Sequence, residues 1–368
     1  MNRIPFVDLR AQYLTIKDSI DTAIADVLNE TSFIGGKHVK EFEKNFATLY
    51  GVKHCISCAN GTDAIYIVLK MLGIGPGDEV ITTACSWIST SETISQAGAR
   101  PVFVDIEPDY FTIDPAQIEK KITPKTKAIV PVHLYGQMAQ INKINTIAQK
   151  HGLHVIEDCA QSHFSELHGQ RAGTFGVAST FSFYPGKNLG AYGDAGCILT
   201  DDDQLAEKCR MYANHGALIK HQHQMEGINS RLDGLQAAIL KAKLPNILDW
   251  TEKRLQVAGW YLENLQGVEQ LTLPVIRPDS KHSFHLFVVR AEQREELVKY
   301  LNDCGIDTAI HYPVPLPFMP AYRYLSHTPE DFPVSDQYQG SILSLPIYPE
   351  LTEEQVKYVC EKIRTFYQ

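Results

Sequence analysis

The sequence lacks any apolar run near the roughly 18 residues that a membrane helix needs. Its start, Met1-Asn2-Arg3-Ile4-Pro5-Phe6, has no hydrophobic core of a secretion signal. It also lacks an excess of positive charge, because 34 Lys and Arg stand against 43 Asp and Glu, for a formal net charge of −9. We therefore expect a cytoplasmic protein with no membrane or nucleic-acid partner, since a nucleic-acid binder would carry a basic surface.

Internal repeats, low-complexity linkers and paired cysteines at zinc spacing are also missing. Cys55-Ile56-Ser57-Cys58 is a lone CxxC motif, and the eight cysteines are scattered, so we expect buried thiols and no metal site. His221 and His223 lie in a predicted loop, where metal binding is disfavoured. At about 150 residues per domain, 368 residues allow two or three domains with a large core.

What the sequence does contain is a regular alternation of short apolar segments with helical ones from residue 54 onward. The expected strands are 54–57, 79–83, 101–104, 128–133, 154–157, 180–183, 196–200 and 284–289. The expected helices are 16–28, 39–50, 62–72, 89–96, 141–151, 292–304 and 352–367, and the segment 203–265 is mainly helical. Such alternation predicts an α/β fold with a mostly parallel sheet. We expect a large α/β domain over residues 1–250 and a smaller α+β domain over residues 251–368.

Three motifs at predicted strand ends carry chemistry. Asn60-Gly61-Thr62 opens a helix whose free N–H groups suit a phosphate, although a helix N-cap explains the same residues. Asp158 ends an apolar strand, where a carboxylate either faces a ligand or caps the next helix. Lys187 lies in an apolar, glycine-flanked loop that would lower the pKa of its amine, whereas a solvated loop lysine is the commoner case. Together they match the requirements of pyridoxal phosphate, which needs a lysine, an acidic partner for its ring nitrogen and a phosphate cradle.

Motifs along the whole chain resemble the nucleotide-sugar aminotransferases of the DegT/StrS type, within fold type I of the pyridoxal phosphate enzymes. The motifs that carry this resemblance are Pro5-Phe6-Val7-Asp8-Leu9, Asn60-Gly61-Thr62-Asp63-Ala64, Pro131-Val132-His133-Leu134-Tyr135-Gly136, Glu157-Asp158, Gly186-Lys187-Asn188-Leu189, Asn229-Ser230-Arg231-Leu232-Asp233, His311-Tyr312-Pro313 and Leu345-Pro346-Ile347-Tyr348-Pro349.

The resemblance implies a role for each matching residue. Lys187 would form the Schiff base and shuttle the proton, and Asp158 would pair with the ring nitrogen. The other implied cofactor residues are Gln161 at the ring hydroxyl, Gly61, Thr62 and Ser182 at the phosphate, Trp87 stacked on the ring and Asn229 at the cofactor of a neighbouring subunit. A core role for Trp87 is the alternative. The implied substrate residues are Tyr184, Arg231, His311 and Tyr312, although Arg231 is equally suited to an intersubunit ion pair.

The activity that the resemblance implies is transfer of an amino group from an amino acid, L-glutamate being expected, to a nucleotide-linked keto sugar. A dTDP-linked 3-keto-6-deoxyhexose is the first choice, a UDP-linked 3-keto sugar acid the second and a 4-keto sugar the third. The implied product is an amino sugar, for instance for a lipopolysaccharide O-antigen, made by a homodimer with shared active sites.

Three other readings compete with this one. A sugar 3-dehydratase of the same fold would carry histidine in place of Lys187. A Rossmann dehydrogenase would carry GxGxxG after an early strand, and none is present. A non-catalytic regulatory protein that binds the cofactor remains the alternative from another functional class.

Overall fold

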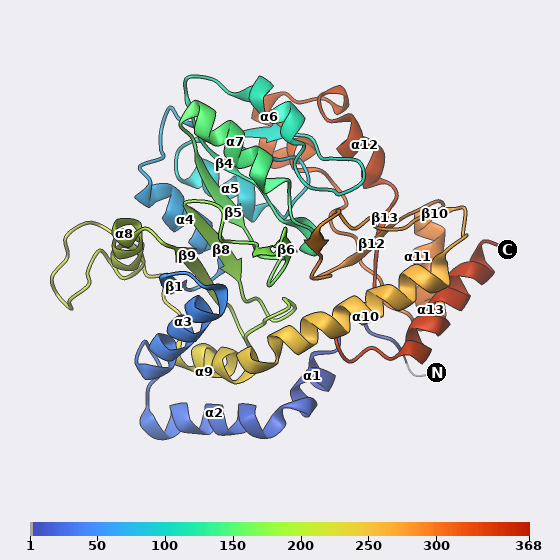
Figure 1. Cartoon of the computed structure of the whole chain (residues 1–368), viewed down its shortest axis with the longest axis horizontal. Helices are drawn as coiled ribbons and strands as arrows, with labels where there is room; N and C mark the ends of the chain where they lie inside the picture. The colour runs from blue at the N-terminus through green and yellow to red at the C-terminus, as the bar shows by residue number, and fades with distance from the viewer. Residues whose placement is uncertain (1–2) are drawn as a thin grey trace.

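A mixed seven-stranded sheet forms the centre of the computed structural model, which describes residues 3–368 (Figure 1). The strand order is β1-β9-β8-β5-β4-β2-β3, and only β9 runs antiparallel to its two neighbours. The strands are β1 His54–Cys58, β2 Glu79–Thr83, β3 Arg100–Val104, β4 Thr126–Val130, β5 His154–Asp158, β8 Ala178–Ser182 and β9 Gly196–Thr200. The prediction of an α/β fold with a mostly parallel sheet is confirmed.

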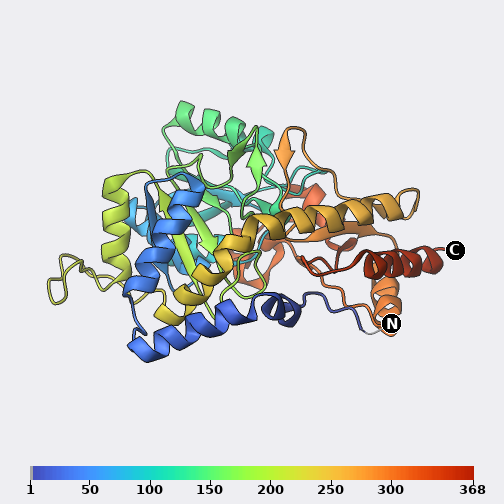
Figure 2. The same cartoon turned by 60° about the horizontal axis from the view of Figure 1, so that its bottom comes forward.

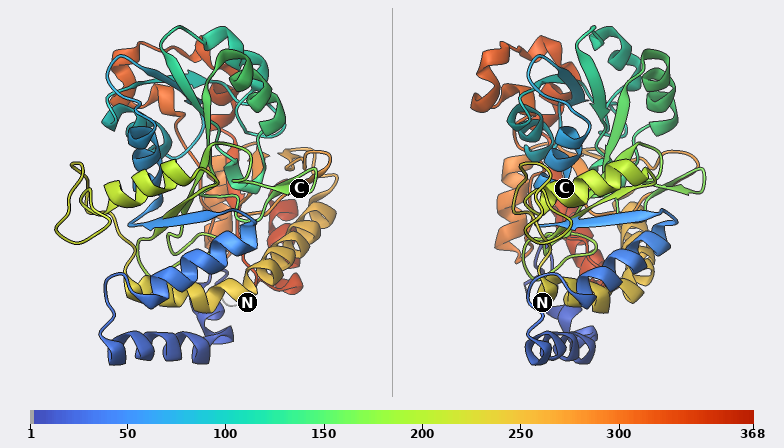
Figure 3. Two further views of the ribbon diagram at one scale, coloured as in Figure 1. Left: turned by 60° about the vertical axis from the view of Figure 1, so that its left-hand side comes forward. Right: turned by 90° about the vertical axis from the view of Figure 1, so that its left-hand side faces the viewer.

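Helices cover both faces of this sheet (Figures 1 and 3). Successive residues of a strand point to opposite faces, and the helices bury them in two separate apolar clusters. In β4, for example, Ile129 belongs to one apolar cluster and Val130 to the other. The helices of this part are α1 Leu9–Thr15, α2 Lys17–Glu30, α3 Lys37–Tyr50, α4 Gly61–Met71, α5 Ser89–Gln96, α6 Pro115–Lys121, α7 Ile141–His151, α8 Asp203–Ala213 and α9 Gly234–Lys243. One face packs mainly against α4, α5 and α8, and the other against α3, α7 and α9.

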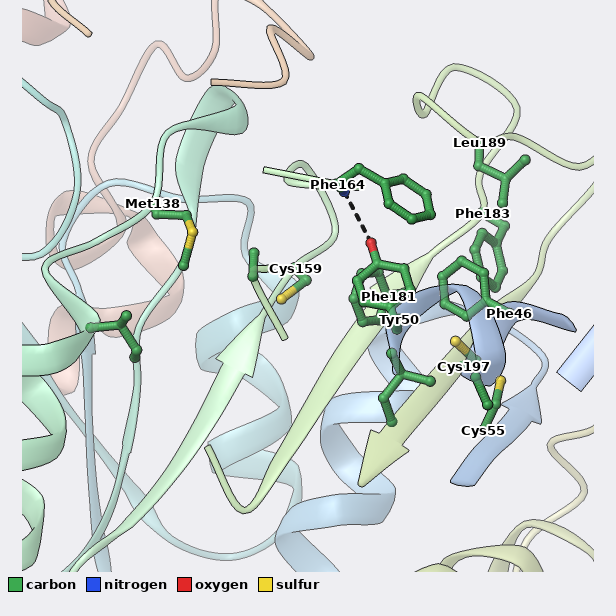
Figure 4. Packing of buried hydrophobic residues seen from close by; sticks show 14 of the residues in the cluster. Phe46, Tyr50, Cys55, Met138, Cys159, Phe164, Phe181, Phe183, Leu189 and Cys197 are labelled. Carbon is green, nitrogen blue, oxygen red and sulfur yellow. Dashed lines mark hydrogen bonds between the residues drawn. The ribbon is translucent and has the colours of Figure 1, made fainter. Parts of the chain in front are cut away.

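Aromatic side chains fill the core beneath the lysine loop (Figure 4). Phe46 of α3 packs edge-on against Phe181 and Phe183, with ring centroids 5.4 and 5.3 Å away. Tyr50 adds a buried polar link, since its hydroxyl accepts a hydrogen bond from the Phe164 N–H at 3.0 Å. This packing holds β8 and the loop that follows it against α3.

A second core lies beyond the long helix α10, Ile247–Leu265, which Figure 2 shows running from the sheet toward both chain ends. Its elements are β10 Leu271–Thr272, β12 Phe287–Ala291, β13 Ile342–Leu345, α11 Arg294–Asp303 and α13 Glu353–Phe366, whereas α12 Pro333–Gln339 packs in a separate cluster with Phe111 and Tyr135. Because Trp250 belongs to the first core and Val257 to the second, α10 joins both. The expected division at residue 250 falls inside this helix and stays a prediction.

The remaining elements are short. They are β6 Glu166–Leu167, β7 Gln170–Arg171, β11 Ser280–Lys281 and the 3-10 helices η1 Leu134–Gly136, η2 Leu244–Asn246, η3 Leu316–Phe318, η4 Pro320–Leu325 and η5 Pro329–Asp331. Most predicted elements agree within a few residues. Residues 214–233, within the mainly helical segment, form a loop that projects past α8 (Figures 1 and 2), which agrees with the loop expected around His221 and His223.

Candidate active site

A cavity of about 570 Å³ opens at the carboxyl ends of the parallel strands, where open α/β sheets bind ligands. Ten of the twelve predicted site residues line it: Gly61, Thr62, Trp87, Asp158, Gln161, Ser182, Tyr184, Lys187, His311 and Tyr312. The sheet therefore gathers residues from positions 61 to 312 at one edge. Asn229 and Arg231 are exposed on the projecting loop and do not line this chain's own cavity.

One end of the cavity is the start of α4. The Asn60 side chain caps this helix by accepting the Asp63 N–H at 2.8 Å, so the N-cap reading of the motif is confirmed. A Cβ at Gly61 would lie 2.7 Å from the Ser182 Cβ, which explains why glycine is needed where the helix meets the end of β8. The Thr62 hydroxyl lies 2.7 Å from that of Ser89. Two helix N–H groups and three hydroxyls thus gather where a phosphate would be held.

The carboxylate of Asp158 lies at the end of β5 and is 5% exposed. Its Oδ2 accepts a hydrogen bond from the Thr90 hydroxyl at 2.8 Å, and its Oδ1 accepts the Ala160 N–H at 3.1 Å. Burial raises the pKa of Asp158, while these hydrogen bonds and the charge of Lys187 oppose that rise. No helix follows at residues 159–165 in the described chain, so the alternative reading of Asp158 as a helix cap is wrong.

The amine of Lys187 reaches the same cavity from a tight loop after β8. The loop closes through hydrogen bonds from Lys187 N–H to the Tyr184 carbonyl and from Ala191 N–H to the Phe183 carbonyl, both 2.8 Å. Burial of the amine lowers the pKa of Lys187 to about 8, against the opposing charge of Asp158. A lysine of this kind is available as a nucleophile and base near neutral pH, unlike a solvated loop lysine.

The opposite wall of the cavity contains a row of hydrogen-bonded residues, Tyr135, Gln161 and Tyr312, which links the sheet to the loop at residues 311–313. Gln161 accepts the Tyr135 N–H at 2.7 Å and donates to the Tyr312 hydroxyl at 3.0 Å. His311 Nδ1 lies 2.9 Å from the Ser344 hydroxyl, and burial lowers the pKa of His311 to about 4, with Lys187 adding to the effect. The hydrogen bond from Gln161 fixes Tyr312. Burial and the charge of Lys187 keep the His311 imidazole neutral in the cavity wall.

Two large aromatic side chains stand at the mouth of the cavity. Trp87 is 58% exposed and Tyr184 is 60% exposed. The Trp87 ring centroid lies 5.7 Å from that of Tyr312. The alternative reading of Trp87 as a core residue is therefore wrong, and its ring is free to stack on a ligand.

Sequence reasoning missed several polar residues of the cavity wall, among them Ser89, Thr90 and Arg254. Ser89 and Thr90 begin α5, and Arg254 lies in the middle of α10. A polar start of a helix after an apolar strand was a usable signal for the first two. Arg254 had none, because its helix is far from every motif in the sequence.

His133, Glu157 and Cys159 form a buried group of potential metal ligands beside the sheet. Their polar atoms already have partners: Glu157 accepts the N–H groups of Gly173, Phe175 and Gly176 and lies 2.9 Å from His133 Nε2. His133 Nδ1 accepts the Ala139 N–H at 3.1 Å. We therefore interpret this group as a structural network that shapes the loop before β8.

Known proteins and a known family are similar to this chain over nearly its whole length. The DegT/DnrJ/EryC1/StrS aminotransferase family matches residues 14–364. A "Pleiotropic regulatory protein" of Geobacillus stearothermophilus is 47% identical over 99% of both chains. A "dTDP-3-amino-3,6-dideoxy-alpha-D-galactopyranose transaminase" of Aneurinibacillus thermoaerophilus is 44% identical, again over 99% of both. A "UDP-2-acetamido-2-deoxy-3-oxo-D-glucuronate aminotransferase" of Pseudomonas aeruginosa is 43% identical over 97% of this chain and 98% of its own.

Solved structures extend the similarity to the fold. DesV of S. venezuelae, in complex with a ketimine intermediate, matches with a TM-score of 0.98 and 41% identity over 100% of this chain and 99% of its own. NtdA of Bacillus subtilis, described with bound cofactor PMP, matches with a TM-score of 0.91 and 33% identity over 100% of this chain and 86% of its own. No helix among residues 3–368 is long and apolar enough to cross a membrane.

Proposed function

This chain belongs to the DegT/DnrJ/EryC1/StrS family of pyridoxal-phosphate-dependent aminotransferases, and on that premise we propose that it aminates a nucleotide-linked keto sugar. The observation that carries the proposal is the meeting of Lys187 and Asp158 in one cavity with the start of α4. A sugar 3-dehydratase and a Rossmann dehydrogenase lack this set. A non-catalytic regulator would have no need of a Lys187 amine whose pKa burial has lowered to about 8, which makes its neutral, nucleophilic form available.

The residues of the cavity fit pyridoxal phosphate. We assign the phosphate to the Gly61 and Thr62 N–H groups with the hydroxyls of Thr62 and Ser182, because the tight approach at Gly61 leaves these donors open to the cavity. Trp87 and Gln161, which line the same cavity, would hold the cofactor ring. When bound, the cofactor supplies an electron sink for the carbon that loses its proton.

Asp158 and Lys187 handle the protons. Asp158, which hydrogen bonds from Thr90 and Ala160 fix in place, would hold a proton on the nitrogen of the bound ring and so keep the ring able to accept charge. The Lys187 amine, with a pKa of about 8, takes the proton from the α-carbon of the amino-acid donor. In the second half-reaction it gives a proton to the sugar carbon that receives the nitrogen.

A sugar with its keto group at carbon 3 is the substrate that we propose, first as a dTDP-linked 6-deoxyhexose. The names of both sugar-acting relatives given above place the amino or oxo group at position 3, which supports carbon 3 over carbon 4. A UDP-linked 3-keto sugar acid is the second candidate, since a relative of nearly equal identity carries that name. Tyr184, His311 and Tyr312 line the cavity where the sugar would lie.

A homodimer with shared active sites completes the proposal. Lys187 and Arg254 are the cationic residues of the described cavity wall, and both lie below its mouth, so a sugar diphosphate there finds no nearby cation of its own chain. Asn229 and Arg231 are exposed on the projecting loop, in reach of a second copy. Exposed apolar side chains support such a contact, namely Leu28, Phe33, Ile34, Leu218 and Ile219. An ion pair between subunits remains the other use of Arg231.

The function is tested with the purified holoenzyme and a panel of dTDP- and UDP-linked 3-keto and 4-keto sugars. We expect L-glutamate to change the visible spectrum of the bound cofactor, and mass spectrometry to find an amino sugar with a 3-keto substrate. Lys187→Ala should abolish product while cofactor still binds, and Lys53→Ala, at an exposed position, serves as the control. A wild-type spectrum that L-glutamate leaves unchanged would contradict the proposal and favour the regulatory reading.

A further inference from the structure

A buried arginine without a direct acidic partner lines the same cavity as Lys187, and the charges of both residues act on His163 and His285. Arg254 is 3% exposed, and its Nη1 donates to the backbone carbonyls of Phe284, His285 and Ile347 at 3.2, 3.4 and 3.0 Å. Its Nε is buried without a partner. Its Nη2 makes no hydrogen bond within residues 3–368 and is the nitrogen left for the cavity that Arg254 lines. Burying a cation without an acidic partner costs free energy, so we expect an anionic ligand to bind the Arg254 guanidinium in the cavity.

Charged groups of both signs share the cavity with Arg254, namely the amine of Lys187 and the carboxylates of Asp158 and Asp194. Glu350 is the acidic side chain whose charge acts on it, without an ion pair between them in the described chain, and Glu350 Oε2 is itself unpartnered. His163 and His285 add no negative charge, and burial lowers the pKa of both, as do the charges of Lys187 and Arg254. Asp158 is already engaged by Thr90 and Ala160.

We propose that Arg254 binds the α-carboxylate of the amino-acid donor through Nη2. The inference rests on the proposed aminotransferase function and adds the residue that recognises the donor. The α-carboxylate is bonded to the same carbon that gives its proton to Lys187, so it requires a cation deep in the cavity and close to that amine. A charge-assisted hydrogen bond from a guanidinium meets this need.

The diphosphate of the sugar substrate fits Arg254 less well. It is attached at a different carbon from the one that receives nitrogen, and it carries a nucleoside that must extend toward the mouth at Trp87 and Tyr184. After the donor has left, a 6-deoxyhexose would offer Arg254 only neutral hydroxyls, whereas a sugar acid would offer it a carboxylate. Loss of its charge should therefore weaken the donor half-reaction selectively.

The test separates the two half-reactions in the holoenzyme. Arg254→Gln should raise the apparent Kd for L-glutamate, followed by the cofactor spectrum, by about 30-fold or more, whereas Arg254→Lys should recover most of that loss. The apparent Kd for the keto sugar nucleotide with the amine form should change by less than about threefold. Calorimetry with maleate, a dicarboxylate that carries no amine to transfer, should give the same ranking: wild type binds maleate most tightly, Arg254→Lys less tightly and Arg254→Gln least tightly.

The outcomes distinguish the inference from the function on which it rests. A wild-type enzyme that does not respond to L-glutamate contradicts both. A responsive wild type whose Arg254→Gln variant keeps its donor affinity overturns the inference alone. If neither variant folds, a crystal structure of the wild-type holoenzyme with maleate decides: a carboxylate oxygen at hydrogen-bond distance from Arg254 supports the assignment, and a carboxylate bound elsewhere overturns it.

Discussion

The hydroxyl of Thr90 donates a hydrogen bond of 2.8 Å to Oδ2 of Asp158, across 68 positions of the sequence. Thr90 begins a helix that follows β2, and Asp158 ends β5, so the sheet brings them together. The bond holds a buried carboxylate in its charged form, against the desolvation that raises its pKa. Asp158 thus needs a second residue to serve as the acidic partner of a ring nitrogen.

Replacing Thr90 tests this dependence. Thr90→Val keeps the shape but removes the donor, and a buried hydrogen bond to a charged group contributes about 1.5–3 kcal/mol. We expect cofactor affinity to fall by roughly tenfold or more, measured by fluorescence titration. Ser95→Ala, at the exposed end of the same helix, is the control and should leave affinity unchanged. Equal affinities in Thr90→Val and wild type would show that Asp158 needs no such support.

The lowered pKa of Lys187 predicts a pH dependence of cofactor capture. Below about pH 8 the amine is charged and has no free electron pair, whereas above it the neutral form dominates. The rate at which the cofactor-free protein takes up pyridoxal phosphate should therefore rise with pH up to about 8 and then level off. Stopped-flow absorbance measures this rate. A midpoint near 10.5, the ordinary value for lysine, would contradict the effect of burial.

The close approach of α4 to β8 predicts a cost for any side chain at Gly61. Gly61→Ala would place a Cβ 2.7 Å from the Ser182 Cβ and 3.1 Å from its Cα, so helix and strand would have to separate. We expect lower thermal stability and a clear loss of cofactor affinity. Gly259→Ala is the matched control, because its Cβ meets nothing within 4 Å in the middle of α10. That variant should be as stable as wild type or slightly more so.

Shared active sites predict complementation between two defective subunits. Asn229→Ala should weaken cofactor affinity, and Lys187→Ala should be inactive. In mixed dimers one site would combine the intact Lys187 of one subunit with the intact Asn229 of the other. We expect a random mixture to recover about a quarter of wild-type activity. Activity no higher than the average of the separate variants would place Asn229 in its own subunit's site or in none.

Local patterns determined much of the fold in advance. The limits of β2, α5, α7 and β9 agree with the predicted ranges, because apolar periodicity and turn residues decide such limits locally. The antiparallel direction of β9 was not predictable, since it depends on which distant segments pair, whereas the loop that carries His221 and His223 was expected. Lys187, Asp158 and Thr62 were identified because their residue types and positions after strands carry the chemistry.

The sequence by itself determined an α/β protein of a recognisable family with an amine, a carboxylate and a helix start suited to one cofactor. The tertiary structure decided which residues meet that set: Thr90 contacts Asp158, Tyr312 contacts Gln161, and Arg254 lines the same cavity as Lys187. It also decided that Asn229 and Arg231 lie outside their own chain's cavity. The physical reason is that hydrogen bonds and desolvation act between neighbours in space, which for these residues are far apart in the chain.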